Sequence, residues 1–284
     1  MTTIEDWKGR VGAEWADKAD ALDTLLGPSG EAAMRALGPL EGRRVLDLGC
    51  GAGATAFALA RAAGPRGEVA GVDVSPPLLE RARRRLAERP MPDAAPLRFV
   101  LADAARWRPD DGAPFDALYS RCGAMFFDDP PAAWAHLRSL TAPGAPLAIA
   151  CWRGPELNLW ASLPLRACAD LLAPAPPPAP GAPGPFAWAD PARVVPVLEG
   201  AGWREVAFTP FDHEVAPELG DDPDPAARAA DFAMRIGPLA SRLAGAPADL
   251  RAEAARRLRA AMAAHLREGA VRLPASAWIV TARA

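Results

Sequence analysis

The chain has 284 residues, 50% of them hydrophobic, and a formal net charge of −3. This composition is typical of a folded globular protein with a sizeable core. The acidic balance gives no overall positive field to hold a polyanion, so we expect no nucleic-acid partner. Apolar runs are too short to cross a bilayer and the first residues lack a basic and then apolar leader. We therefore expect no membrane contact and a cytoplasmic protein.

The first forty residues predict helices. Trp7, Val11, Trp15 and Lys18 recur at the spacing of one helix face. A second short helix is expected to begin at Ser29. We interpret this part as a helical lead-in to the rest of the chain.

An apolar run over residues 45–48 is followed by three glycines and then by an alanine-rich helical stretch at 54–63. Such a run predicts a strand that is covered on both faces. Gly49, Gly51 and Gly53 permit a tight turn and a close approach of the backbone to a ligand. A strand, a glycine loop and a helix N-terminus form a small-molecule site at the carboxyl edge of a parallel sheet.

Strands and helices alternate from this point. Parallel crossovers and a doubly wound sheet follow from such alternation. The predicted strands are 44–48, 68–73, 97–101, 115–119 and 146–151, and the predicted helices between them are 54–63, 76–88 and 130–140. Further along, we predict a helix at 191–200, a strand at 203–215, helical stretches at 226–243 and 247–267, and a strand at 277–282.

Carboxylates lie at the ends of successive strands. Asp47 precedes the first glycine by two residues, and Asp73 ends the next strand, where its two acceptor oxygens suit ribose hydroxyls. The bare glycine pattern also fits a dinucleotide loop, so an NAD(P)-dependent oxidoreductase is one alternative. A nicotinamide site has no regular need for a carboxylate at Asp47, which disfavours that alternative.

Three segments carry a family resemblance. Residues 46–53 resemble motif I of the class I S-adenosylmethionine (SAM) dependent methyltransferases, 71–75 resemble their second motif, and 101–104 resemble the third. The resemblance implies that SAM is the cofactor. Asp73 would then take both ribose hydroxyls, Asp103 with Ala104 would frame the adenine, and Asp47 would face the amino end of the tail through water. The residues expected at the cofactor are Asp47, Gly49, Cys50, Gly51, Gly53, Asp73, Val74, Asp103, Ala104, Ser120 and Arg121.

The resemblance also implies the fold class. We expect an α/β, Rossmann-like, doubly wound seven-stranded sheet whose last strand is antiparallel, with a helical and loop cap. The expected segments are a helical lid (1–32), a SAM-binding core (33–152), a proline-rich cap loop (153–193), a continuation of the core (194–216), a helical insertion forming the cap (217–270) and the last core strand (271–284).

The run from Ser120 to Phe127, with residues 184–190, resembles a bacterial subgroup of small-molecule methyltransferases that defines no single substrate. It implies methyl transfer to a small, apolar or aromatic acceptor at an O, N, S or C atom. Trp7 shares the lid, and the residues expected to line the acceptor pocket are Trp15, Met125, Trp152, Trp160, Phe186 and Trp188. The alternative is that these rings only fix helices to the sheet.

Other roles stay open at this point. His213 is a candidate general base, although a lone histidine is more often structural. Arg121 lines the site or forms an internal salt bridge. No metal is expected, because Asp128 and Asp129 precede a proline and suit a helix N-cap. A SAM-binding fold that acts as a binding or cyclisation module is a further alternative, and the oligomeric state is not predicted.

Overall fold

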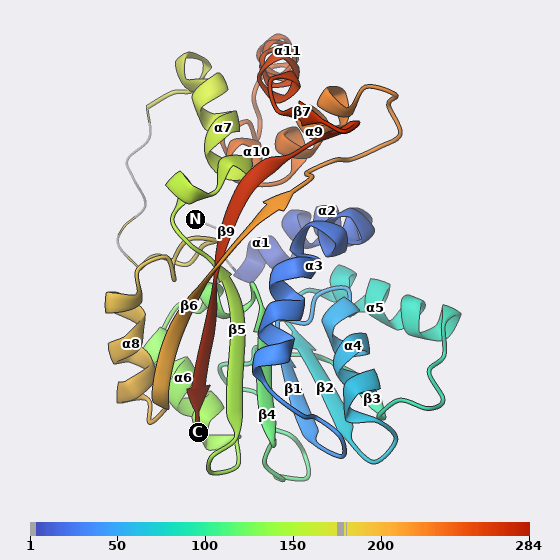
Figure 1. The fold of residues 1–284 in the computed structure, drawn as a ribbon, viewed down its shortest axis with the longest axis vertical. Coiled ribbons are helices and arrows are strands. Elements are labelled where there is room, and N and C mark those ends of the chain that lie inside the picture. The colour runs from blue at the N-terminus through green and yellow to red at the C-terminus, as the bar shows by residue number, and fades with distance from the viewer. Residues whose placement is uncertain (1–3, 175–178, 180) are drawn as a thin grey trace.

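The computed structural model describes residues 4–174, 179 and 181–284. At its centre lies a seven-stranded sheet in the order β3-β2-β1-β4-β5-β9-β6 (Figure 1). Strands β1 to β5 pair in parallel, whereas β9 is antiparallel to both β5 and β6. The expected doubly wound sheet with an antiparallel last strand is confirmed. The strands are β1 (Arg44–Leu48), β2 (Glu68–Asp73), β3 (Leu97–Leu101), β4 (Ala117–Arg121), β5 (Pro146–Trp152), β6 (Arg204–Val215) and β9 (Leu273–Arg283).

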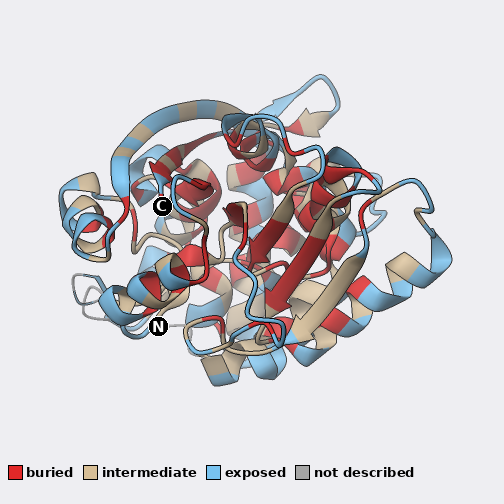
Figure 2. Ribbon diagram, turned by 90° about the horizontal axis from the view of Figure 1, so that it is seen from below, coloured by how far each residue is buried: buried red, intermediate tan, exposed pale blue. Residues whose placement is uncertain are grey.

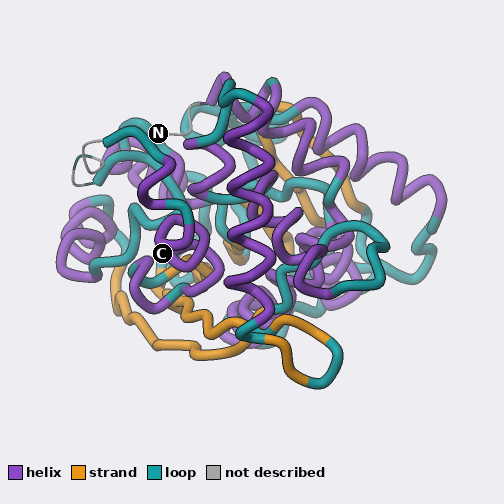
Figure 3. The backbone as a smooth tube through the Cα atoms, turned by 90° about the horizontal axis from the view of Figure 1, so that it is seen from above, coloured by secondary structure: helices purple, strands orange, loops and turns teal. Residues whose placement is uncertain are grey.

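Helices cover both faces of this sheet, and its central strands are accordingly mostly apolar. Every residue of β5 is buried, and Figure 2 shows the buried residues gathered in the strands while the outer helix surfaces are exposed. Figure 3 shows the helices on both sides of the strands. One face carries α3 (Ala19–Ala36), α4 (Ala54–Ala63) and α5 (Pro76–Glu88), and the other carries α6 (Pro130–Ser139) and α8 (Pro191–Gly200) (Figure 1).

The lead-in differs from its prediction. After α1 (Ile4–Lys8) and α2 (Arg10–Asp17), the single helix α3 runs through Ser29 without a break. Tertiary contacts outweigh the weak helix propensity here. The Tyr119 hydroxyl donates a 2.9 Å hydrogen bond to the Gly30 carbonyl, and a side chain at Gly30 would lie 2.8 Å from Arg121 Cδ. The predicted second helix start is therefore wrong, since α3 is pressed against β4 at this point.

A helical cap stands above the carboxyl edge of the sheet (Figure 1). It contains α7 (Leu159–Ala167), α9 (Pro225–Arg235), α10 (Pro238–Arg242) and α11 (Ala248–Ala263). The predicted helix at 226–243 is interrupted at Gly237, whose φ of +97° and following proline end α9. The predicted helix at 247–267 ends early, and a hairpin of β7 (Leu266–Arg267) and β8 (Ala270–Val271) follows it.

Part of the predicted proline-rich loop, residues 175–178 and 180, lies outside the described residues. Short 3-10 turns complete the connections at η1 (Ala124–Phe126), η2 (Pro155–Leu157) and η3 (Ala169–Leu171). Among the described helices, none combines the length and the hydropathy that crossing a bilayer requires. The division of the chain into a lid, a core and a cap insertion stays a prediction.

A single buried asparagine ties the cap to the sheet. The Asn158 side-chain amide donates to the carbonyls of Arg153, Gly154 and Ser276 at 3.0–3.1 Å. Its carbonyl oxygen accepts from the Ser276 backbone N–H at 3.0 Å and from Trp160 Nε1 at 3.2 Å. This side chain therefore joins the start of α7 to β9.

We expect Asn158→Ala to lower the free energy of unfolding by about 3 kcal/mol, because several buried donors and acceptors would lose their hydrogen-bond partner at once. Urea denaturation followed by circular dichroism measures this. Ser162→Ala is the control, since its hydroxyl contacts only the Asn158 backbone carbonyl, at 3.3 Å. Equal losses in the two variants would contradict the proposed tie.

Candidate functional site

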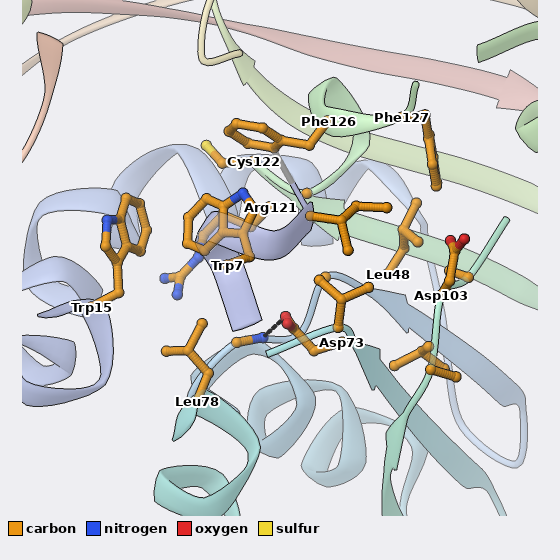
Figure 4. Close-up of a pocket in the computed structure, with 18 residues that line it drawn as sticks. Trp7, Trp15, Leu48, Asp73, Leu78, Asp103, Arg121, Cys122, Phe126 and Phe127 are labelled. Atoms are coloured by element: carbon orange, nitrogen blue, oxygen red, sulfur yellow. Dashed lines mark hydrogen bonds between the residues drawn. The ribbon is translucent and has the colours of Figure 1, made fainter. Parts of the chain in front are cut away.

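A cavity opens at the carboxyl ends of β1, β2 and β4. Its empty volume is about 760 Å³, a figure that includes space open to solvent. The glycine turn after β1 and the end of β2 form one wall, and α1 and α2 lie across the opposite side (Figure 4). The position at the carboxyl edge agrees with the sequence prediction.

The backbone itself forms part of the wall at the glycine turn. Gly49 has a φ of +67°, and a side chain there would lie 2.8 Å from Gly123 Cα. The turn after β1 thus touches the turn after β4. The Ser120 hydroxyl holds this contact by donating to the Leu48 carbonyl at 2.8 Å and accepting from the Gly123 N–H at 3.3 Å. A bare backbone surface is what close approach of a ligand requires.

Asp73 lies on the wall beside this turn. Its Oδ2 accepts from the Gly51 N–H at 2.8 Å (Figure 4), and its Oδ1 accepts from the Ser75 N–H at 2.9 Å. Burial raises the pKa of Asp73, and these two N–H groups oppose that rise. Each carboxylate oxygen has a second lone pair available, so Asp73 can still accept hydrogen bonds from hydroxyl groups.

Asp103 and Ala104 line the same cavity beyond Asp73. The Asp103 side chain accepts from the Ala105 N–H at 2.9 Å through Oδ1. In Figure 4, Asp103 lies at one end of the cavity and Trp15 at the other. A ligand that touched both ends would have to be elongated.

Asp47 lies behind the wall and is fully buried. Its Oδ2 accepts from the Thr55 hydroxyl at 2.7 Å, but its Oδ1 has no hydrogen-bond partner among the described residues. Burial raises the pKa of Asp47 to about 7. A buried carboxylate oxygen without a partner is costly, and a bound cation or its water is the kind of group that would satisfy it.

Three aromatic rings form the opposite wall. Trp7 contacts Trp15 at 5.1 Å between ring centroids and Phe126 at 5.3 Å, both edge to face. They come from α1, α2 and η1 and line the cavity together. Helix α2 sits tightly on the start of α5, because a side chain at Gly12 would lie 2.2 Å from Ser75 Oγ.

Arg121 combines the two roles that the sequence left open. It lines the cavity, and its Nη2 donates to Asp23 Oδ1 at 2.6 Å. Asp23 also accepts from Arg85 Nη1, at 2.8 Å. The guanidinium is therefore held in place from α3, and its charge is already partly balanced.

The next residue, Cys122, also lines the cavity and has a φ of +58°. Such a backbone conformation is unusual for a residue with a side chain and is concentrated at functional sites. Burial raises the pKa of the Cys122 thiol to about 12, so it stays neutral at physiological pH.

The structure brings most of the predicted cofactor residues to one cavity. The predicted cofactor residues on its wall are Gly49, Gly51, Asp73, Val74, Asp103, Ala104 and Arg121. Trp15, which was predicted for the acceptor pocket, lines the same cavity. Asp47, Cys50 and Gly53 lie outside that wall, close to the glycine turn. Ser120 also departs from its prediction, because its hydroxyl is spent on the contact between the two turns.

The other predicted acceptor residues lie elsewhere. Trp152 packs on Trp160 at 5.1 Å and stacks on His213 at 6.2 Å, and Trp160 stacks on Phe186 at 6.0 Å. None of these four lines the cavity. Met125 and Trp188 line a second, neighbouring cavity.

The prediction of His213 as a base gains no geometric support. Its strand, β6, is separated from β4 by β9 and β5. The ring is stacked on Trp152, its Nδ1 lies 3.4 Å from the Phe211 carbonyl, and burial lowers the pKa of His213. His213 therefore belongs to the cluster of rings formed with Trp152, Trp160 and Phe186.

Several wall residues were not among the predicted site residues. Cys122, Gly123, Phe126 and Phe127 follow β4. They belong to the run from Ser120 to Phe127 that carries the family resemblance, and this run is the signal that points to them. Leu78 was assigned to the apolar stripe of its helix, yet it also reaches the cavity. Periodicity cannot separate a core contact from a ligand contact.

Within the described ranges, no group of three or more acidic, histidine or cysteine side chains is placed to hold a metal ion. Asp129 instead caps α6, accepting from the Ala132 N–H at 3.1 Å. This agrees with the N-cap interpretation of the sequence.

Comparison with known proteins agrees with this geometry. Residues 45–144 match a methyltransferase domain family. A trans-aconitate 2-methyltransferase of Methylobacterium radiotolerans is 42% identical over 112 residues, 39% of each chain. A nocamycin O-methyltransferase of Saccharothrix syringae is 33% identical over 139 residues, 48% of each chain. The chain thus spans less than half the length of these relatives.

Solved structures show the same fold at low identity. The YcgJ protein of Bacillus subtilis superposes with a TM-score of 0.56 at 16% identity, covering 90% of this chain and 98% of that one. A Haemonchus contortus phosphoethanolamine N-methyltransferase, solved with S-adenosylhomocysteine, gives a TM-score of 0.51 at 14% identity, covering 90% of this chain and 52% of that one. Residues 45–144 thus match a methyltransferase domain family, and the chain shares its fold with these solved structures.

Proposed function

We propose that this chain binds SAM in the cavity at the carboxyl edge and transfers its methyl group to a small apolar or aromatic acceptor. The observation that carries the proposal is the pair of carboxylates beside a bare glycine turn, Asp73 on the wall and Asp47 buried behind it with an unpaired oxygen. A sulfonium compound with an amino group is a cation and suits this charge. The pyrophosphate of a dinucleotide is an anion and does not.

The wall residues fit the parts of the cofactor in order. Asp73 would accept from the ribose hydroxyls, and Asp103 with Ala104 would hold the adenine at one end. Asp47, buried behind the wall, would balance the amino group through water. Trp15 lies at the other end, where an aromatic face can stabilise a sulfonium.

The acceptor class follows from what remains of the wall. Trp7, Trp15 and Phe126 offer apolar aromatic surface, and Arg121 is the only lysine or arginine among the lining residues that the structure describes. Arg121 is already paired with Asp23. A tricarboxylate such as the trans-aconitate of the relatives' name would meet too little positive charge here, so we infer an acceptor with a large apolar surface.

Positioning would supply most of the catalysis. SAM provides an activated methyl group, and the neutral thioether that leaves needs little stabilisation. The aromatic wall would exclude water and hold the acceptor in line with the methyl carbon. No histidine lines the cavity within the described part of the chain, so the reaction depends on an acceptor that needs no histidine base.

Isothermal titration calorimetry with S-adenosylhomocysteine tests the proposal. We expect the wild type to bind this product and to give no signal with NAD⁺. Asp73→Asn should weaken binding at least tenfold. The amide has one acceptor oxygen in place of two, so it cannot accept from both ribose hydroxyls. It also removes the carboxylate charge that accepts from the backbone N–H groups of the turn. Asp111→Asn, at an exposed carboxylate paired with Arg44, should leave affinity unchanged. Binding of NAD⁺ in place of the product would overturn the proposal.

A radiolabelled methyl-transfer assay separates an enzyme from a binding module. Product binding without turnover on any aromatic or apolar acceptor tried would favour the binding or cyclisation alternative. We expect trans-aconitate to be a poor acceptor in this assay.

The raised pKa of Asp47 predicts a pH dependence. Because burial disfavours its ionised form, the pKa near 7 should fall when a cation binds, so binding releases a proton. SAM affinity should therefore decrease as the pH falls below about 7. In Asp47→Asn this dependence should disappear, and the unliganded protein should melt no lower than wild type at pH 8, where the wild type holds a costly buried charge. Unchanged pH dependence in Asp47→Asn would assign it to another group.

Two tryptophans distinguish a ligand wall from structural packing. Trp15 lines the cavity and Trp160 does not. We expect Trp15→Ala to lower SAM affinity with a small change in melting temperature, and Trp160→Ala, at a buried ring, to lower the melting temperature with SAM affinity retained. Thermal shift and calorimetry on both variants measure the two effects. The reverse pattern would place the SAM site beside Trp160 and contradict the assignment of the first cavity.

A further inference from the structure

A second cavity adjoins the first and shares Phe127 as a wall residue. Its empty volume is about 740 Å³, part of it open to solvent. It lies between the segment after β4, residues 124–130, and the part of the chain that leads into α8. The Gly184 N–H joins these two segments by donating to the Met125 carbonyl at 3.2 Å.

Most of the residues that line this cavity are apolar, and other side chains support them from behind. Met125 and Trp188 are almost fully buried beside it. Behind them, Trp134 packs on Trp188 at 5.3 Å and on Phe127 at 6.1 Å between ring centroids. Val197 of α8 completes one side. A preformed hollow lined mainly by apolar residues, with one charged group, is a typical setting for a small-molecule site.

One charged side chain, Arg193, lines the cavity, and it is exposed. Within the described residues its guanidinium has neither an ion-pair partner nor a hydrogen-bond partner. Two acidic residues at the starts of the neighbouring helices are already used, since Asp190 caps α8 through the Ala192 N–H and Asp129 caps α6 through the Ala132 N–H. The sequence from 173 to 189 contains no acidic residue that could neutralise Arg193.

Two helices begin beside this cavity. Both α6 and α8 are ten residues long, and Pro130 and Arg193 lie in their first turns. The partial positive charge at each N-terminal end is already offset by the carboxylate that caps it, Asp129 or Asp190, so Arg193 carries the positive charge at the cavity. No carboxylate lines this cavity among the described residues, in contrast to the first one.

From these contacts we infer that the second cavity binds a small molecule with an apolar body and one acidic group, which pairs with Arg193. Figure 4 places Phe127 on the Asp103 side of the first cavity, away from Trp15. The second site therefore adjoins the Asp103 end of the first cavity. We place methyl transfer at the other end, beside Trp15. It is a ligand site separate from the acceptor site, and it stands whether or not the first cavity binds SAM.

Calorimetry on the full chain with a matched pair of probes tests this inference. The probes are 1-naphthaleneacetate and 1-naphthaleneacetamide, which share an apolar body and differ in the charged group. We expect the acid to bind about tenfold more tightly than the amide, as a charge-assisted hydrogen bond to an arginine predicts. Arg193→Gln should bring the acid to the affinity of the amide. Arg84→Gln, which removes an exposed arginine of α5 outside both cavities, should change neither.

Val197→Trp tests whether the probes bind in the second cavity. The larger side chain should fill the cavity and abolish binding of both probes, and circular dichroism with thermal melting establishes that the variant is folded. If it does not fold, Arg193→Gln alone decides the question, since this surface change leaves the core intact. The inference is overturned if acid and amide bind equally to the wild type, if neither binds at millimolar concentration, or if Arg193→Gln has no effect. Full binding to folded Val197→Trp would place the ligand elsewhere and overturn it as well.

Discussion

The contact between the two turns after β1 and β4 determines the rest of the site. Gly49 and Gly123 meet with room for no side chain, and Ser120 joins them by two hydrogen bonds. This contact leaves bare backbone at the carboxyl edge and directs the Arg121 and Cys122 side chains to the cavity. It also fixes the start of the segment that carries Phe126 and Phe127. A parallel sheet provides the edge, but the paired glycines make it a place where a ligand can lie against the backbone.

Charge is distributed around this contact so that the two cavities differ. Asp73 and Asp103 line the first cavity, and Asp47 lies behind its glycine turn, whereas Arg121 there is tied to Asp23. The second cavity has one free arginine and no carboxylate among the described residues. The two hollows share Phe127 yet favour ligands of opposite charge. Because the two charge sets line separate cavities on either side of Phe127, a pair of ligands suits them better than a single ligand.

The sequence was informative where one local pattern sufficed. Strand β1, the glycine turn and Asp73 follow from an apolar run and its neighbours, and the parallel order follows from alternation. Sequence reasoning failed where tertiary contacts decided the outcome. Helix α3 continues through Ser29 because Tyr119 and Arg121 pack on Gly30. The aromatic residues were all expected at one pocket, yet Trp15 lines the first cavity, Trp188 the second and Trp160 neither. Spacing along the chain does not determine which cavity a ring will line, because that depends on how the helices and loops pack.

The shared ring gives the two cavities a physical means of coupling. Phe127 contacts Trp134 edge to face, and Trp134 contacts Trp188 on the wall of the second cavity. A ligand that fixes Trp188 and Met125 would restrict the positions open to Phe127, and so the shape of the first cavity at its Asp103 end. Any such effect must be reciprocal, because a coupling free energy is the same from either side. Occupancy of the second cavity would then change SAM affinity by the same factor as SAM changes affinity for the acid, with no part of the sheet having to move.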